Sequence, residues 1–217
     1  MQLNTDFLQR VCLLHHDLPW VDSPMPGVRR RMLERDGDEV ARATSIVQYA
    51  PGSRFPRHNH ALGEEILVLE GVLTDEFGRH GAGTYLKNPA GTAHSPATEH
   101  GCTLLVKLRH LDPSDRQQVR VDATTAQWHP GLVEGLTVLP LSSFGTSHTA
   151  MVRWAPGTTF HAHRHHGGEE IFVVDGTFED EHGSYPAGSW IRSPHRSLHT
   201  PFSRSGCTIF VKTGHLA

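Results

Sequence analysis

The sequence predicts an all-β protein that contains the same domain twice. Residues 44–111 align with residues 149–216 without a gap, and 29 of the 68 aligned pairs are identical. The repeated segments are short β-rich runs separated by Gly, Pro, Asp and Asn. Helical patterns are scarce, and only residues 5–15 and 113–118 resemble short helices. Many short strands with frequent turns favour a β-sandwich or a barrel.

The strongest strand patterns occur at matched places in the two copies. The first of each alternates apolar and polar residues, the second ends at a glycine, and the third is rich in β-branched residues. They are residues 44–50, 64–71 and 102–108 in the first copy and residues 149–155, 169–176 and 207–213 in the second. Residues 111–138 join the copies, and residues 119–121 have the pattern of a further strand. We therefore place an N-terminal domain with a lead-in arm at residues 1–113 and a C-terminal domain at residues 114–217.

The composition is that of an ordinary soluble globular protein, with 37% hydrophobic and 20% charged residues. A net charge of −3 offers no electrostatic basis for binding nucleic acid or an anionic membrane. No apolar run is long enough to cross a bilayer, and the first residues lack the features of a signal peptide. The three cysteines form no disulfide framework. We expect a cytoplasmic protein with no nucleic-acid or membrane partner.

Both copies carry the same set of metal-ligand residue types. A His-x-His-x3-Glu cluster is followed about thirty residues later by another histidine. Side chains at i and i+2 of a strand share a face, so the paired histidines can point the same way. Three imidazoles and one carboxylate suit divalent ions such as Zn, Fe, Mn, Co, Ni or Cu. The candidate ligands are His58, His60, Glu64 and His94 in the first copy and His163, His165, Glu169 and His199 in the second.

The acid of each set has an acidic neighbour, so residue type alone does not identify the ligand. Glu65 follows Glu64, and Glu170 follows Glu169. The six-residue spacing to the glycine that ends each run favours Glu64 and Glu169 as ligands. We expect the second acids to orient neighbouring groups.

Other residues recur in pairs around these sets. Cys102 and Cys207 lie in apolar strand patterns and are expected in the core. The remaining pairs are Phe55 and Phe160, expected to wall the pocket; Tyr85 and Trp190, which line its mouth or pack; and Lys107 and Lys212, expected as strand-end cations rather than catalytic groups.

The motifs around the ligands resemble those of the cupin superfamily. The pattern G-x5-H-x-H-x3-E-x6-G begins at Gly52 and again at Gly157, and G-x5-P-x-G-x2-H is complete at residues 83–94. In the second copy of this G-x5-P-x-G-x2-H motif, Arg196 stands where glycine is usual. This departure affects the expected conformation of the turn and not the histidine ligand. The resemblance implies two tandem double-stranded β-helix barrels of the jelly-roll-like cupin type, a bicupin, over nearly the whole chain.

Finer features resemble the ChrR-type cupin family. They are the run H-x-H-x2-G-E-E-I-x-V-x-[ED]-G, a following D-E, and G-C-T-x2-V-K. In that family's namesake, the cupin domain binds zinc and belongs to an anti-sigma factor of oxidative-stress signalling. The resemblance implies the same eight ligands, a zinc ion as the favoured cofactor, and a regulatory role.

The chain departs from that family at its N-terminus. The anti-sigma half of such proteins is a helical domain with a His-x3-Cys-x2-Cys motif, whereas here the N-terminal region has only Cys12 and the sequence has no Cys-x2-Cys. We therefore expect no tight sigma-factor complex from this chain alone.

Three functions stay open on the sequence. The favoured one is a metal-binding regulatory sensor of a small molecule or an oxidant. The second is an Fe(II)-dependent dioxygenase acting on a small carbonyl or aromatic compound, because four protein donors can either close a tetrahedral zinc site or leave positions open on Fe, Mn or Ni. The third is a small-molecule binding or storage module. No Ser-His-Asp arrangement or phosphate-binding glycine loop is evident, and the sequence is compatible with a homo-oligomer.

Overall fold

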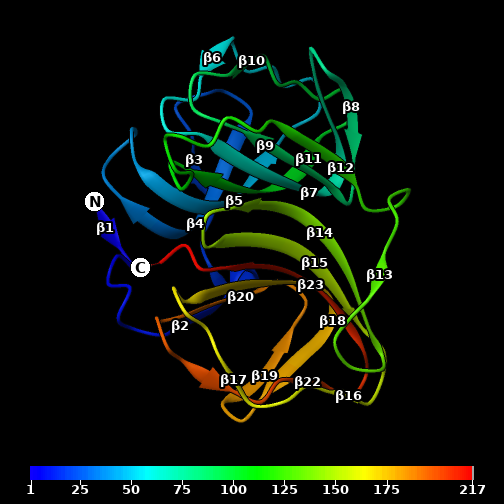
Figure 1. The fold of residues 1–217 in the computed structure, drawn as a ribbon. Coiled ribbons are helices and arrows are strands. Elements are labelled where there is room, and N and C mark those ends of the chain that lie inside the picture. Colours follow the sequence, from blue (N-terminus) through cyan, green and yellow to red (C-terminus); the bar gives the residue numbers. More distant parts are fainter. Residues whose placement is uncertain (217) are drawn as a thin grey trace. The chain divides into compact units, whose positions relative to one another are not determined.

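The computed structural model describes residues 1–216, which form two β-barrel units (Figure 1). The all-β prediction is confirmed: these residues contain 23 strands, one 3-10 turn (η1, His15–Asp17) and no α-helix. The two helical patterns were wrong, because residues 5–15 include strand β2 (Val11–Leu14) and residues 113–118 are irregular. Strand pairing of β2 overrides the weak local preference for a helix. Within residues 1–216, no helix has the length and apolar character needed to cross a membrane.

The N-terminal unit comprises residues 1–5 and 18–125. Its main sheet has the strand order β1-β4-β5-β11-β7-β9-β12, while β3 pairs with β4, β8 with β7, and β6 with β10. The strands are β1 (Gln2–Leu3), β3 (Val21–Asp22), β4 (Val28–Asp36), β5 (Arg42–Tyr49), β6 (His58–Asn59), β7 (Glu64–Asp75), β8 (Gly78–Gly81), β9 (Thr84–Asn88), β10 (Ala93–His94), β11 (Cys102–Leu108) and β12 (Val119–Asp122).

The C-terminal unit comprises residues 6–17 and the chain from residue 126 onward. Its main sheet has the matching order β13-β14-β15-β23-β18-β20-β2, and β17 pairs with β21. Besides β2, the strands are β13 (His129–Pro130), β14 (Leu136–Phe144), β15 (Ser147–Trp154), β16 (Thr158–Thr159), β17 (His163–Arg164), β18 (Glu169–Asp180), β19 (Gly183–Pro186), β20 (Ser189–Ser193), β21 (Leu198–His199), β22 (Phe202–Ser203) and β23 (Cys207–Thr213).

The strand that precedes each repeat in the chain pairs with the other repeat. β12 precedes the second repeat and pairs with β9 of the first, whereas β2 precedes the first repeat and pairs with β20 of the second. The compact units therefore differ from the simple division at residue 113. Residues 114–125 belong with the N-terminal unit, and residues 6–17 belong with the C-terminal unit.

The interior of each barrel is filled by every second residue of its strands. Matched apolar clusters result: Val28, Tyr49, Ile66, Val68, Leu73, Leu86, Cys102, Leu104 and Val106 in one unit, and Leu136, Trp154, Ile171, Val173, Phe178, Tyr185, Ile191, Cys207 and Ile209 in the other. The repeated glycine in the middle of β7 and of β18 has a steric cause. A Cβ on Gly71 or Gly176 would lie 2.2 Å from the backbone oxygen of Gly101 or Gly206, the residue just before the neighbouring strand, and both glycines have a positive φ.

Candidate metal centres

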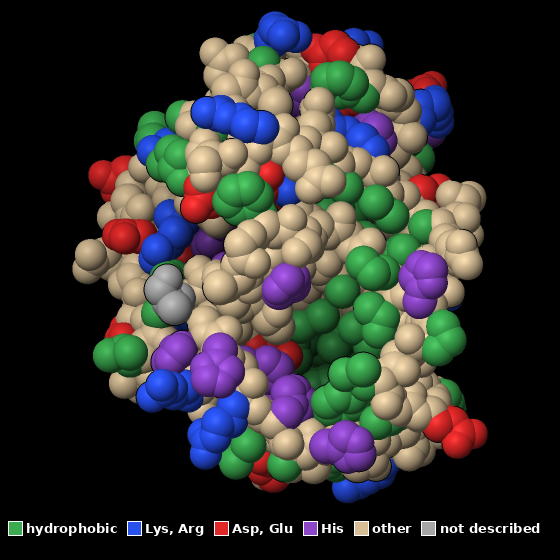
Figure 2. Space-filling model, viewed as in Figure 1, with side chains coloured by type: hydrophobic (Ala, Val, Ile, Leu, Met, Phe, Trp, Pro, Cys, Tyr) green, Lys and Arg blue, Asp and Glu red, His purple; other side chains and the backbone are tan. Residues whose placement is uncertain are grey.

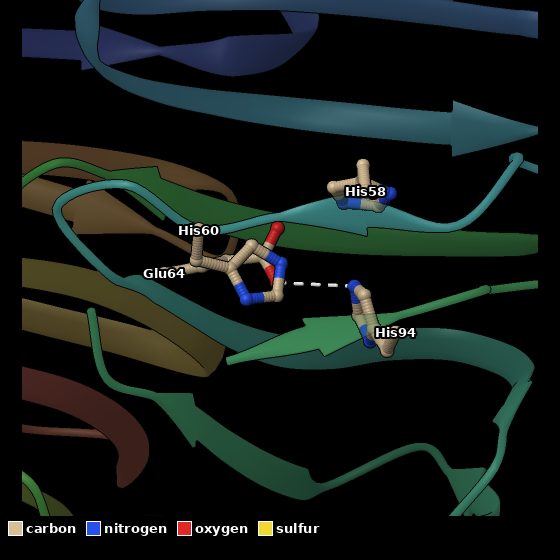
Figure 3. A group of neighbouring side chains, drawn as sticks. All are labelled: His58, His60, Glu64 and His94. Carbon is tan, nitrogen blue, oxygen red and sulfur yellow. Dashed lines mark ion pairs between the residues drawn. The ribbon is translucent and has the colours of Figure 1, made fainter. Parts of the chain in front are cut away.

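The four donors predicted for the first copy converge inside the N-terminal unit (Figure 3). One ligand atom from each of His58, His60, Glu64 and His94 lies within 4.8 Å of all the others. Strand pairing explains the convergence, since His58 in β6 lies directly opposite His94 in β10. Glu64 enters from the first residue of β7.

Each histidine of this cluster directs Nε2 towards the centre, because Nδ1 is occupied. The Nδ1 contacts are His58 with the Pro56 carbonyl oxygen at 3.0 Å, His60 with Thr92 Oγ1 at 3.0 Å, and His94 with Asp75 Oδ2 at 3.2 Å. The Nε2 atoms of His60 and His94 are buried and have no hydrogen-bond partner. Buried imidazole nitrogens without a partner, held in orientation from behind, fit a divalent metal ion.

Glu64 is held as a carboxylate. Asn88 Nδ2 donates to Glu64 Oε2 at 3.1 Å, and the same oxygen lies 3.2 Å from His60 Nε2 and 3.4 Å from His94 Nε2. Burial by itself raises the pKa of Glu64, but His60, His94 and Asn88 outweigh it and lower the pKa to about 2. The site is therefore ready to bind a cation without first losing a proton from the acid.

The C-terminal unit brings the equivalent residues together less tightly. Ligand atoms of His163, His165 and His199 all lie within 4.8 Å of one another, and Glu169 is not part of that group. Glu169 still lies 3.4 Å from His165 Nε2 and 3.6 Å from His199 Nε2. The Nε2 atoms of His165 and His199 form a hydrogen bond at 3.0 Å. Two imidazole nitrogens facing each other at this distance also fit a shared ion.

Glu169 lacks the amide that supports Glu64. In the strand register Glu64 is opposite Asn88, whereas Glu169 is opposite Ser193. Glu169 Oε2 is buried without a hydrogen-bond partner, and burial raises the pKa of Glu169 to about 7. Burial, together with the neighbouring His199 and His163, lowers the pKa of His165 to about 3.

The structure resolves which acid of each pair faces the centre. Strand alternation turns Glu65 and Glu170 to the opposite face, where Tyr85 Oη donates to Glu65 at 2.7 Å and Trp190 Nε1 donates to Glu170 at 2.8 Å. Tyr85 and Trp190 are both fully buried, so they pack rather than line a mouth.

Arg196 keeps a positive φ of 62°, like Gly91 at 87°, and the turn survives the departure from glycine. The rings of Phe55 and Phe160 lie 4.9 Å and 5.0 Å from those of His58 and His163, as expected for pocket walls.

Cys102 and Cys207 are buried, and burial raises the pKa of each thiol to about 11. Lys107 and Lys212 are buried in their strands and donate to Thr44 and Thr149.

Several supporting residues were not singled out from the sequence. Asp75 and Asp180 contact Nδ1 of the last histidine in each set, and their recurrence in the repeat was a signal that could have identified them. Asn88 and Arg120 gave no such signal. Arg120, from β12, donates to Asn88 Oδ1 at 2.6 Å, so the joining segment supports Glu64 through one intermediate side chain.

The cavities beside the two centres differ in size and lining. In the N-terminal unit, a cavity of about 440 Å³ includes His58, His60, Glu64 and His94 in its wall. In the C-terminal unit the cavity is about 180 Å³ and, apart from His163, Glu169 and His199, its lining is apolar. Figure 2 shows a hollow lined by hydrophobic side chains in the C-terminal unit, with histidines at its rim.

Solved structures with the same fold come from several bacteria. A protein from Nostoc punctiforme described as a candidate dioxygenase has a TM-score of 0.80 at 15% identity, covering 95% of this chain and 82% of that one. Oxalate decarboxylase from Lactobacillus farciminis has a TM-score of 0.67 at 15% identity, covering 95% and 86%. A cupin 2 conserved barrel domain protein from Leptotrichia buccalis has a TM-score of 0.65 at 12% identity, covering 98% and 99%. At these identities the likeness establishes the fold alone.

A sequence search among curated proteins finds no match. The family model for the ChrR cupin-like domain, in contrast, matches twice and covers almost the whole chain. The chain therefore belongs to the ChrR cupin-like domain family, with one copy of the domain in residues 8–112 and a second in residues 116–217.

Proposed function

We propose that this bicupin is a metal-dependent regulatory protein of the ChrR type, in which each barrel binds one divalent ion through three histidines and one glutamate. The observation that carries this proposal is the convergence of the first donor set. Four donors lie within 4.8 Å of one another, and the Nε2 atoms of His60 and His94 are buried without a hydrogen-bond partner and face Glu64. The family match across both repeats supports the regulatory role.

Zinc is the ion we propose for both barrels. Four protein donors of the His3Glu type can complete a tetrahedral zinc site, and three of the four donors in each barrel are buried. Bound zinc would supply Lewis acidity and hold the donor-bearing strands together. The chain contributes the orientation of its imidazoles through Pro56, Thr92 and Asp75.

The test is metal analysis of protein purified without added metal, followed by aerobic turnover assays. Two equivalents of zinc and no oxygen consumption with small diketones or hydroxyacetophenones are the expected results. Bound iron together with oxygen consumption would overturn the regulatory proposal and support the second candidate.

That second candidate is an Fe(II)-dependent dioxygenase acting on a small carbonyl or aromatic compound. The cavity of about 440 Å³ favours it, because the predicted ligands line a space large enough for an organic substrate. A resident iron would supply the oxygen chemistry, while the cavity walls would exclude water and position the substrate. Substrate-dependent oxygen uptake that His58→Ala abolishes would establish this function.

We also propose that this chain forms no stoichiometric complex with a sigma factor. The sequence contains no Cys-x2-Cys for an anti-sigma zinc motif. Pull-down with a cognate extracytoplasmic-type sigma factor, under reducing and oxidising conditions, is expected to recover none. A one-to-one complex that survives moderate salt would contradict this.

A further inference from the structure

Strand β4 places two arginines inside the N-terminal barrel. Arg30 pairs with Val47 and Arg35 with Ala43, and all four residues line the cavity that contains the metal donors. Residues five apart on a regular strand would face opposite sides. The irregularity between Met32 and Glu34 shifts the alternation by one residue, so Arg30 and Arg35 face the same interior.

A third arginine reaches the same cavity from a strained position. Arg109 lines the cavity and has a φ of 61°, a conformation that costs a residue with a Cβ. Its backbone N–H donates to the Gly63 carbonyl oxygen, as that of Gly214 donates to Gly168. The second copy thus uses glycine for the same turn, and within residues 1–216 the Arg109 guanidinium makes no hydrogen bond or ion pair.

None of the three arginines has a counterpart in the C-terminal unit. By strand pairing, Val138 occupies the place of Arg30 and Ser143 that of Arg35, while Gly214 replaces Arg109. The smaller cavity there is lined by Leu136, Val138 and other apolar side chains. The arginines are therefore a feature of one barrel and not a requirement of the fold.

Three arginines outnumber the two acids, Glu39 and Glu64, that line the N-terminal cavity. Glu39 forms an ion pair with Arg30 at 2.7 Å, but its own side chain is 60% exposed on the loop between β4 and β5, whereas that of Arg30 is 15% exposed. Arg35 is 4% exposed and donates to the Asp38 carbonyl oxygen, and it also feels the charges of Glu39 and Asp38. Burial and the neighbouring Arg30 lower the pKa of Arg35, which reflects the crowding of two guanidinium groups.

We propose that the N-terminal barrel binds a small organic acid, with its carboxylate on Arg30, Arg35 and Arg109 and its apolar body along the barrel wall. This proposal names a ligand class for the site of the proposed function. It rests on metal binding there, since a second oxygen of the ligand would face the metal donors. Guanidinium groups match a carboxylate in geometry and charge. A neutral oxidant would gain no charge pairing from three of them. Glu39 occupies the anion position in the free protein and swings out with its exposed loop.

The test is calorimetric titration of the metal-loaded protein with a matched pair of probes, 4-acetylbenzoate and 4-acetylbenzamide. They share the aromatic body and the carbonyl oxygen and differ in charge. The acid is expected to bind at least about tenfold more tightly than the amide. Arg30→Val and Arg35→Ser, which introduce the residues of the C-terminal barrel, should each remove most of that difference.

Two further variants separate recognition from folding. Arg29→Val removes the same charge from the outer face of β4, where Arg29 donates to Gln48, and should leave the acid's affinity unchanged. Glu39→Gln should tighten binding of the acid several-fold, which no loss of structure would produce. Equal binding of acid and amide, no saturable binding of the acid, or no change in Arg30→Val would overturn the proposal. Metal content is measured separately: protein without metal that still prefers the acid would sink the proposed function alone.

Discussion

The two barrels share a fold and a donor set but differ in what surrounds the donors. Glu64 receives a hydrogen bond from Asn88 and lies beside a cavity of about 440 Å³, whereas Glu169 lacks such a donor and lies beside one of about 180 Å³. His60, His94 and, to a smaller extent, Asn88 outweigh burial and lower the pKa of Glu64 to about 2, whereas burial raises the pKa of Glu169 to about 7. Duplication thus preserved the candidate ligands, whereas their surroundings diverged: the N-terminal donors lie beside a larger cavity with charged residues, and the C-terminal donors beside a smaller apolar one.

The largest expected effect is loss of metal from one barrel at a time. His58→Ala should empty the N-terminal site and His163→Ala the C-terminal site, because each removes one of four donors and should weaken binding by at least about 100-fold. The double variant should hold no metal by elemental analysis. His166→Ala removes an exposed neighbouring histidine and serves as the control. Full metal content in the double variant would show that the ligand assignment is wrong.

Metal removal should lower the melting temperature at neutral pH. An ion that binds only the folded state, at about 100 to 1,000 times its dissociation constant, stabilises by about 3–4 kcal/mol per site. The chelator's effect should be lost at acid pH, where the histidines are protonated and stop coordinating. Thermal melts with and without chelator measure this, and the double variant should not respond. An unchanged melt of the wild-type protein at neutral pH would mean that the metal is peripheral.

The acids of the two centres should contribute to the metal-free protein's stability with opposite signs. The pKa of Glu64 is lowered from 4.5 to about 2, so its ionised form stabilises the fold above pH 4.5 and this is lost as the pH falls towards 2. The pKa of Glu169 is raised from 4.5 to about 7, so its ionised form destabilises the fold. This destabilisation is absent below pH 4.5 and complete above pH 7.

Denaturant unfolding of the metal-free variants measures this difference. At pH 8, Glu64→Gln should lower the free energy of unfolding and Glu169→Gln should raise it, each by roughly 1–3 kcal/mol. At pH 5 the gain from Glu169→Gln should largely disappear, while the loss from Glu64→Gln persists. Changes of the same sign at pH 8 would contradict the contrast between the barrels.

The smallest expected effect comes from exchanging the residues opposite the acids. Asn88→Ser should weaken metal binding in the N-terminal barrel about tenfold, and Ser193→Asn should strengthen it in the C-terminal barrel by a similar factor, since a hydrogen bond to a ligand typically changes affinity by this much. Metal titration in the His163→Ala and His58→Ala backgrounds, respectively, isolates each site. Equal affinities in the two unexchanged barrels would remove the basis of this prediction.

Most of the predictions of strands and candidate ligands came from local sequence patterns. The recurrence of His-x-His-x3-Glu and the period-2 runs such as residues 102–108 reflect properties of single strands. They can therefore be recognised in the sequence without a tertiary structure. Asp75 and Asp180 also recur in the repeat, although their contact with His94 and His199 was not predicted.

The all-β class, the duplication and the eight residues gathered at the two centres could be predicted without coordinates, because they depend on repeats and strand alternation. The folded structure was needed to show that β2 and β12 pair with the opposite repeats, since strand pairing joins segments far apart in the chain. It also decided that Arg120 supports Glu64 through Asn88. The irregularity in β4 likewise brought Arg30 and Arg35 to one face, because a shift of one residue reverses the side on which every later side chain lies.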